Sequence, residues 1–223
     1  ASGTTEITGK VGNDSVISPS GLGDGDGASL IIQGSGPVIF IETITLAQGI
    51  SQTGTAGSVT FRSDVTVSGG TTTTTFDANV ILDGMTFTSA SDVRVGTTPM
   101  DGDTLTLSTD TATLSGAGNW TVYSAVNSAG ALDQCTLALA GAGTKTFEDT
   151  IGATQPVLSL TQADGSGALT LRANTTVGTS GVDLQGNVVL DGMTFSSAGS
   201  VVIGTSVADT DTLTLSTDTA TLT

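Results

Sequence analysis

The stretch Asn79-Val-Ile-Leu-Asp-Gly-Met-Thr-Phe87 occurs twice in this chain, because Asn187-Val-Val-Leu-Asp-Gly-Met-Thr-Phe195 repeats it in the second half. The correspondence continues without a gap to the last residue, and 26 of the 37 aligned positions are identical. Weaker matches at a similar offset extend it back through the rest of the 223 residues. A long internal repeat indicates an architecture built by stacking similar units. We therefore interpret the chain as two copies of one unit, residues 1–115 and residues 116–223.

Within each copy, apolar residues alternate with Thr or Ser in short runs that recur about every ten residues. Val59-Thr-Phe61, Met85-Thr-Phe87 and Leu105-Thr-Leu107 are examples, and turn sequences such as Asp83-Gly84 separate them. Alternation places the apolar side chains of each run on one face of a β-strand. The 31 glycines and the abundant threonines disfavour helix. The pattern predicts an all-β fold.

Two all-β architectures accommodate such short strands. A parallel β-helix, or β-solenoid, stacks its coils so that the apolar residues form one continuous column. The nested repeat favours this fold, as does the tract Thr71–Thr75, which suits outward-facing ladders from coil to coil. Tandem β-sandwiches are the alternative, because Asp-Gly at 83–84 and 191–192 between alternating runs is typical of a β-hairpin.

The texture of the repeats resembles a known family. Gly143–Ile151, Ala168–Val177 and Val182–Leu190 are similar to repeats of very large filamentous-haemagglutinin-like adhesins, and to segments of autotransporter passengers and other giant bacterial surface proteins. The resemblance implies a right-handed parallel β-helix, secretion, and a role in adhesion or surface structure. It implies no catalytic or binding residues at fixed positions. The unit spans about half of the chain, which is unusually long for the family, so the resemblance does not define the coil length.

The charge of the chain excludes several classes of partner. It has 21 acidic residues, 5 basic residues and no His, which gives a formal net charge of −16. Such a chain cannot neutralise a row of phosphates, which excludes nucleic acid, and it would be repelled by an anionic membrane surface. No apolar run approaches the roughly 20 residues that membrane insertion of a helix requires. Cys135 is the single cysteine, so no intrachain disulfide forms, and its alternation with Leu137 and Leu139 predicts a buried thiol.

Acidic loop residues are the candidate metal ligands. Asp24 and Asp26 lie in Gly23-Asp-Gly-Asp-Gly27, which offers two carboxylates and free backbone carbonyls to Ca²⁺. Turn formation is the competing interpretation of the same residues. Equal melting midpoints in Ca²⁺ and in EDTA would rule out the metal site. Further acidic pairs at loop positions are Asp101 with Asp103, Asp209 with Asp211, and Asp110 with Asp218.

Trp120 and Tyr123 are the candidate residues for a surface contact. Asn119-Trp-Thr-Val-Tyr123 would suit a glycan-binding spot on a surface loop, and packing near a repeat junction is the competing interpretation of the Trp. The Thr-x-Thr spacing within Thr212–Thr221 is compatible with ice binding, although any solvated strand face has the same alternation.

A polysaccharide-acting β-helix enzyme is the least supported alternative. Its site would need clustered carboxylates assisted by basic residues, whereas His is absent and the five basic residues are scattered. Arg62 and Arg172 occupy equivalent places in the two copies, as residues with a structural role do. We therefore expect no enzyme activity.

The function expected from the sequence is structural or adhesive, as a stalk or filament at the extracellular surface of a cell. Thr219–Thr223 lies inside a strand-like run and does not resemble a cap for a terminal coil. The expected partner is therefore the protein itself, through head-to-tail or lateral copies, or through further repeats of a longer chain. Glycans are a second expected partner, and Ca²⁺ is the one cofactor for which the sequence offers a candidate site.

Overall fold

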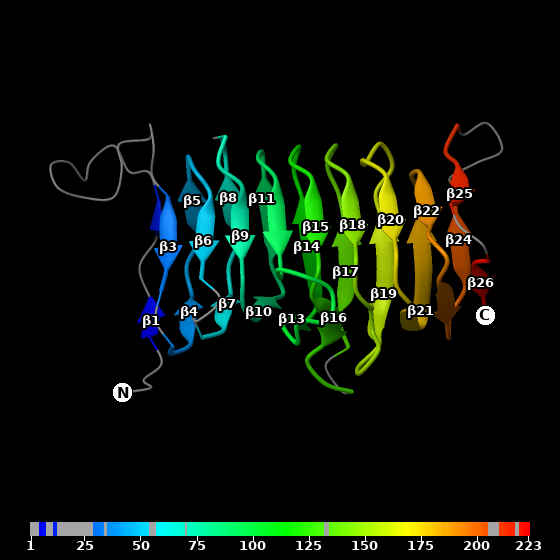
Figure 1. Cartoon of the computed structure of the whole chain (residues 1–223), viewed down its shortest axis with the longest axis horizontal. Helices are drawn as coiled ribbons and strands as arrows, with labels where there is room; N and C mark the ends of the chain where they lie inside the picture. The colour runs from blue at the N-terminus through cyan, green and yellow to red at the C-terminus, as the bar shows by residue number, and fades with distance from the viewer. Residues whose placement is uncertain are drawn as a thin grey trace, which may run out of the picture.

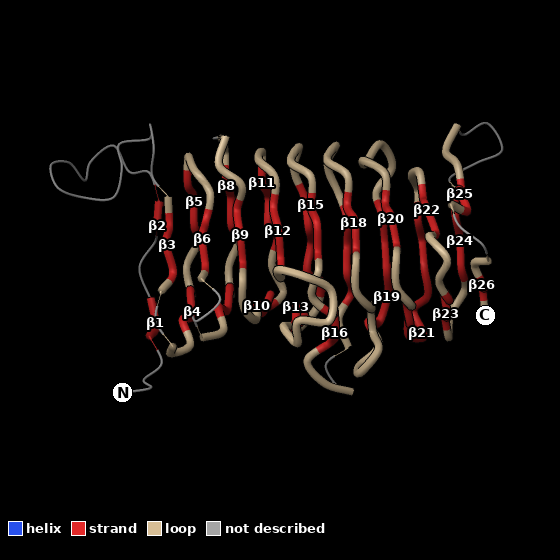
Figure 2. The backbone as a smooth tube through the Cα atoms, viewed as in Figure 1, coloured by secondary structure: helices blue, strands red, loops and turns tan. Residues whose placement is uncertain are grey.

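The chain coils into a β-solenoid. The structure is a computed structural model that describes residues 5–7, 11–12, 29–33, 35–53, 57–69, 71–131, 134–204, 210–216 and 219–223. Its short strands stack rung upon rung along one axis, from the N-terminal end to the C-terminal end (Figure 1), in about eight turns. The described residues contain strands and loops and no helix (Figure 2). The all-β prediction is confirmed.

Three strands make one turn, so the solenoid has three faces. The first face contains β1 (Thr5–Ile7), β4 (Val38–Phe40), β7 (Val59–Phe61), β10 (Val80–Asp83), β13 (Thr104–Ser108) and β16 (Ala125–Ser128). The second face contains β2 (Val11–Gly12), β5 (Ile44–Leu46), β8 (Val65–Val67), β11 (Thr86–Ser89), β14 (Thr111–Ser115), β17 (Thr136–Leu139) and β19 (Val157–Gln162). The third face contains β3 (Leu30–Ile32), β6 (Ile50–Gln52), β9 (Thr74–Phe76), β12 (Val93–Val95), β15 (Trp120–Val122), β18 (Lys145–Phe147), β20 (Leu169–Leu171), β22 (Val188–Leu190) and β25 (Leu213–Leu215).

The first two faces continue through one long strand near the C-terminal end. β21 (Thr175–Leu184) pairs through its first half with β23 (Thr194–Ser197) and through its second half with β24 (Val201–Ile203). β23 in turn pairs with β26 (Thr221–Leu222). Bridges of Ile151 to Val126 and to Thr175 join this part to β16 on the first face.

Every strand pair is parallel, which decides between the two predicted architectures. Val59, Val80 and Leu105 lie side by side on successive turns of the first face. The spacing of paired residues along the chain varies from turn to turn, since Val93 pairs with Thr74 on one side and with Trp120 on the other. A hairpin at Asp83-Gly84 would pair β10 with β11 in antiparallel fashion, whereas these strands belong to different faces. The β-sandwich alternative is therefore wrong.

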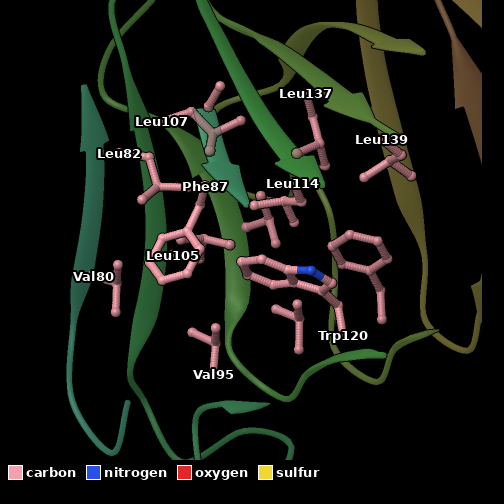
Figure 3. Close-up of a cluster of buried hydrophobic side chains, with 14 of the residues drawn as sticks. Val80, Leu82, Phe87, Val95, Leu105, Leu107, Leu114, Trp120, Leu137 and Leu139 are labelled. Carbon is pink, nitrogen blue, oxygen red and sulfur yellow. The ribbon is translucent and has the colours of Figure 1, made fainter. Parts of the chain in front are cut away.

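One apolar column runs along the axis. Alternate side chains of each strand point inward, and most strands show the burial pattern of a buried, half-buried and buried residue. Phe87 packs edge to face on Phe61, Phe76 and Trp120. Its ring centroid lies 5.2 Å from that of Trp120, and Figure 3 shows these two side chains in the core. Cys135 is fully buried in the same core, as its alternation predicts.

Outward-facing residues form ladders along the faces. Thr121, Thr146 and Thr170 lie at the same register on successive turns of the third face. The ladder expected from Thr71–Thr75 is only partly present, because Thr74 points inward, is fully buried, and accepts a hydrogen bond from the backbone N–H of Ile50 at 3.2 Å. Its strand begins within the tract, so alternate threonines face opposite sides.

The two sequence copies occupy different faces of one continuous solenoid. β10 and β22 carry the repeated sequence, yet β10 lies on the first face and β22 on the third. Along the first face, Val80 is followed on successive turns by residues 105, 126, 151 and 175, so four turns separate Val80 from residue 175. From residue 175 the chain passes to the second face and then to the third, where Val188 lies. The unit is therefore not a whole number of turns. Across the boundary between residues 115 and 116 the sheet is unbroken, since β14 pairs with β17.

Candidate functional site: the stacking surface between turns

One candidate functional site is the surface that each turn of the solenoid offers to the next. In the first copy, Leu105, Leu107 and Leu114 are at most 1% exposed, because β16 and β17 cover them. Their equivalents at the C-terminal end are exposed apolar residues, namely Leu213 (43%), Leu215 (56%) and Leu222 (50%). The same sequence is thus core in one copy and open surface in the other.

A buttressing ion pair between turns recurs in both copies. Arg62 Nε lies 3.4 Å from Asp83 Oδ2, and Arg172 Nε lies 3.4 Å from Asp191 Oδ2. The first pair is at the first face and the second at the third, so the contact follows the sequence and not the face. Arg172 also donates to Glu148 Oε1 of the preceding turn at 2.6 Å. The prediction that Arg62 and Arg172 have a structural role agrees with this geometry.

Asn side chains connect successive turns just before the strands begin. Asn79 Oδ1 accepts hydrogen bonds from the backbone N and the Oγ1 of Thr104, at 2.8 and 3.0 Å. Asn119 does the same to Thr144, at 3.0 and 2.9 Å, and Asn187 to Thr212, at 2.9 and 2.8 Å. In each pair, one of the two bonds gives an acceptor to a backbone N–H that the strand ladder leaves without one. The alternating pattern did not predict these pairs. Their signal in the sequence is an Asn and a Thr at the same fixed separation, each directly before an alternating run.

Interior Gln side chains tie the turns to the core. Gln52 Nε2 donates to the carbonyl of Gly57 at 2.7 Å, and Gln162 Nε2 donates to the carbonyl of Gly167 at 2.9 Å. Both Gln residues are buried, and the two pairs are equivalent in the two copies. Because the inter-turn and turn-to-core contacts repeat with the sequence, each copy carries its own means of stacking.

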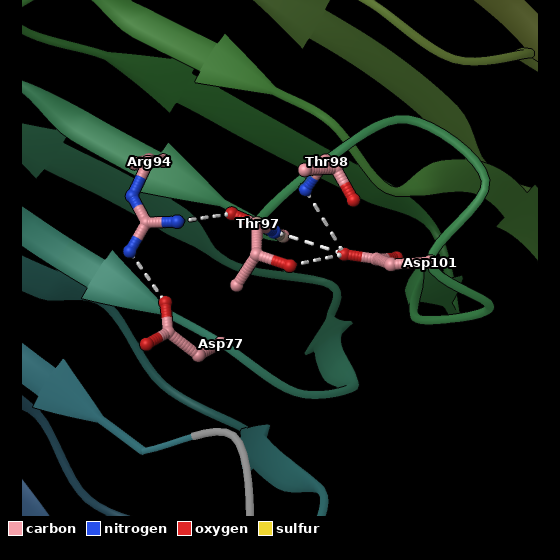
Figure 4. Close-up of polar contacts among 6 residues, drawn as sticks. Asp77, Arg94, Thr97, Thr98 and Asp101 are labelled. Atoms are coloured by element: carbon pink, nitrogen blue, oxygen red, sulfur yellow. Dashed lines mark hydrogen bonds and ion pairs between the residues drawn. The ribbon is translucent and has the colours of Figure 1, made fainter.

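The loop from Thr97 to Asp103 is held by its own aspartate (Figure 4). Asp101 Oδ2 accepts from the backbone N of Thr97 and of Thr98, at 2.9 and 3.3 Å. Asp101 Oδ1 accepts from the backbone N of Asp103 at 3.0 Å. Burial by itself would raise the pKa of Asp101, but these N–H donors hold it below its usual value. Burial, with the charges of Asp101 and Asp77, raises the pKa of Asp103.

This loop has the construction of a self-contained turn. Beside it, Arg94 pairs with Asp77 at 2.5 Å and donates to the carbonyl of Gly96 at 2.7 Å (Figure 4). Within the part of the chain that the structure describes, no group of three or more His, Cys, Asp or Glu side chains could hold a metal ion. Asp24 and Asp26 lie outside the described residues, as do Asp209 and Asp218, so their Ca²⁺ hypothesis stays a prediction.

Trp120 is a core residue. Its side chain is 2% exposed, packs against Phe87, and donates from Nε1 to the carbonyl of Ser115 at 3.3 Å. A surface contact through Trp120 is therefore wrong, because β15 turns this residue inward, and the packing interpretation is confirmed. Tyr123 lies just beyond the strand and is half-buried, so its contact with a glycan stays a prediction.

Lys145 is the one described basic residue whose side chain is fully enclosed. It is 1% exposed, and Nζ donates to the carbonyls of Ala140, Gly141 and Gly143 at 2.5, 2.8 and 2.6 Å. Burial lowers the pKa of Lys145 to about 8. In the sequence, Lys145 is one of five scattered basic residues. The alternation Lys145-Thr-Phe147, equivalent to Val38-Ile-Phe40, is the signal that it points inward.

Comparison with known proteins does not assign the chain to a family. No family model, no curated protein and no solved structure matches the chain. The described residues include no helix long and apolar enough to cross a membrane. The stacked parallel sheets therefore define the class, a β-solenoid repeat protein, and nothing in the comparisons defines a narrower one.

Proposed function

We propose that this is a non-enzymatic structural repeat protein whose function is to extend as a stiff rod. The observation that carries the proposal is the stacking surface. Leu213, Leu215 and Leu222 present to solvent the side chains that their equivalents bury under a following turn. Exposing apolar residues on open strand edges is unfavourable and invites pairing with another strand of the same kind. A further solenoid turn, whether from the same chain or from another copy, would complement this surface.

The contacts between turns support extension without a fixed limit. The Arg–Asp pair, the Asn–Thr hydrogen bonds and the Gln–Gly contacts each join two residues of the same unit. Stability of such an array is approximately a sum of unit and nearest-neighbour terms, so added turns do not weaken the rest. Each described basic residue pairs with a carboxylate or with backbone carbonyls of the chain, which is consistent with a structural role.

The further proposal is that the rod is an adhesive stalk or filament at an extracellular cell surface. Its support is the resemblance of the repeats to filamentous-haemagglutinin-like adhesins, together with the acidity of the chain, which suits solubility at high density. Because the copies fall on different faces, a feature carried by each unit would be presented to a different side in successive copies. Such a rod can contact partners all around its axis, as an adhesin embedded among other surface molecules would need to.

Negative-stain microscopy of the purified protein tests the rod. We expect rods whose lengths increase with concentration, and a double variant, Leu213→Asp with Leu215→Asp, that stays short. Thr146→Asp with Thr170→Asp is the matched control, since it adds the same two charges to outward positions of the third face and should not shorten the rods. Rods of one length that neither pair of substitutions changes would show that this surface does not assemble copies. Compact round particles would contradict the rod itself.

The location and the adhesive role need a separate experiment. Antibody against the chain should label intact cells of the source, and protease added to intact cells should remove the label. Label that appears only after lysis would contradict the surface location. A glycan array probed with the wild-type chain and with Tyr123→Ala tests whether glycans are partners and whether Tyr123 contributes to their binding.

A further inference from the structure

The turn between β17 and β18 departs from the repeat in one chemical respect. Lys145 occupies the interior position that Val38 holds in the first copy. A charged side chain at this inward position breaks the alternation that places apolar side chains in the core. Departures of this kind are expected at functional or strained sites. The neighbours of Lys145 in the same inward column are Trp120 on the preceding turn and Leu169 on the following turn. The lysine is therefore enclosed along the axis on both sides.

The turn itself is built of backbone. Gly141 and Gly143 pack so closely on the preceding turn that an added Cβ would lie 2.4 Å from the Gly116 backbone and 1.9 Å from the Gly118 carbonyl oxygen, respectively. Side chains are thus excluded from this corner, and carbonyl oxygens line its inner side. Three of them converge on Lys145 Nζ at 2.5 to 2.8 Å. An ammonium group has three N–H donors, and each has one carbonyl acceptor here.

The same corner also needs a donor on the preceding turn. Trp120 holds the equivalent position of the inward column on that turn, and its Nε1 donates to the Ser115 carbonyl over a distance of 3.3 Å. Carbonyl groups that point into a dry interior are costly unless a donor reaches them. One turn uses an indole N–H and the next an ammonium, and only the second concentrates three carbonyl groups on one point.

No other charge takes part in this arrangement. The inward side chains of β15 and β20 next to Lys145 are Trp120, Val122, Leu169 and Leu171, none of which titrates. The turns at 116–118 and 140–143 contain only Gly and Ala. Burial is accordingly the cause of the lowered pKa of Lys145, and at about 8 it leaves the amine protonated at neutral pH. The cation is held by dipoles alone.

We propose that the turn at residues 140–143 is a carbonyl-lined binding site for a primary ammonium group, which Lys145 occupies as a tethered ligand. The recognition is by hydrogen-bond geometry, because three converging acceptors match three N–H donors, and not by a counter-charge. If the tether is removed, the site should accept a free primary ammonium ion of the right length. This proposal does not depend on how the rod extends.

Chemical rescue of Lys145→Ala tests the site. Alanine removes three methylene groups and the ammonium, which n-propylammonium supplies. We expect a lowered melting midpoint for the variant that n-propylammonium chloride raises in a saturable manner, while tetramethylammonium chloride at the same ionic strength does not, since it has no N–H donor. Lys145→Met is the matched control, because its side chain fills the space and leaves no room for the ion. Equal effects of the two salts, or equal responses of the two variants, would overturn the proposal.

A measurement on the wild-type chain keeps the proposal testable if Lys145→Ala fails to fold. In NMR spectra at pH 7, the Lys145 ammonium protons should exchange with water far more slowly than those of free lysine. They should also show couplings across hydrogen bonds to the carbonyl carbons of Ala140, Gly141 and Gly143. An ammonium signal that exchanges as fast as in free lysine would show that the site does not hold the group.

Discussion

Replacing Phe87 by Ala should destabilise the protein more than replacing its sequence equivalent, Phe195. Both residues follow Met-Thr in the same repeated stretch, and both are buried, at 1% and 3% exposed. Their surroundings differ. Phe87 packs edge to face on Phe61, Phe76 and Trp120, with centroids 5.9, 6.0 and 5.2 Å away. Phe195 has no aromatic ring pair among the described residues, and its partner on the next turn, Leu222, is 50% exposed.

The magnitudes follow from these surroundings. Truncating a buried Phe to Ala costs about 3–5 kcal/mol, with the higher values where the cavity cannot collapse. Around Phe87, three aromatic contacts worth about 0.5–1.5 kcal/mol each are lost, and neighbours on both adjacent turns hold the cavity open. We therefore expect a loss of about 5 kcal/mol for Phe87→Ala. For Phe195→Ala we expect about 3 kcal/mol, because the neighbouring final turn can relax into the space.

Urea unfolding followed by far-ultraviolet circular dichroism and by the fluorescence of Trp120 measures both variants. Trp120 is the only tryptophan and lies in the central turns, so the two probes also show whether the solenoid unfolds in one step. Thr146→Ala, at an outward position, is the control and should change the free energy of unfolding by less than about 0.5 kcal/mol. Equal losses for the two Phe variants, or a larger loss for Phe195→Ala, would refute the argument from packing.

Three further predictions concern the turns. Gly118→Ala should reduce stability by about 3 kcal/mol or more, because the added Cβ would lie 1.9 Å from the Ser91 carbonyl oxygen. Gly69→Ala is the control, since its Cβ would have a nearest contact of 3.5 Å and should be tolerated, and thermal melting compares the two variants. Asn79→Ala leaves the backbone N–H and hydroxyl of Thr104 without their acceptor and should cost about 1 kcal/mol in urea unfolding, while Thr104→Val, which loses only the hydroxyl bond, should cost less. For Lys145, the pKa is about 8 in the folded chain against 10.5 in the unfolded chain, so folding releases a proton between these pH values. The contribution of Lys145 to stability therefore rises with pH in this interval, by up to about 3 kcal/mol, and does not change below pH 8. Lys145→Met should lack this rise, and parallel pH profiles of the two proteins in urea would contradict the assignment.

The sequence by itself determined the strand character, most of the apolar core and the all-β class of the fold. Alternation of an apolar residue with Thr, as in Val59-Thr-Phe61, is a local property that dictates which side chains face inward, and the structure buries both Val59 and Phe61 completely. The inward position of Cys135 followed from the same rule. The nested repeat favoured a solenoid, because units that cannot bury their own faces must stack, but only the parallel pairing of the strands excluded sandwiches.

Only the tertiary structure decided which strands lie together and what the polar residues do. The number of residues in a turn depends on loops of varying size, since Val93 is separated along the sequence by different numbers of residues from its partners Thr74 and Trp120. Counting residues along the chain therefore cannot show that the unit spans four turns and two faces. The surroundings of two interior residues could not be predicted for the same reason. Trp120 and Lys145 are polar-tipped side chains whose interior placement depends on carbonyl groups of a turn folded back over them, at Ser115 and at Ala140 to Gly143. Local alternation specifies the direction of a side chain, whereas the partner it meets there is brought by residues that only the coiling of the chain places nearby.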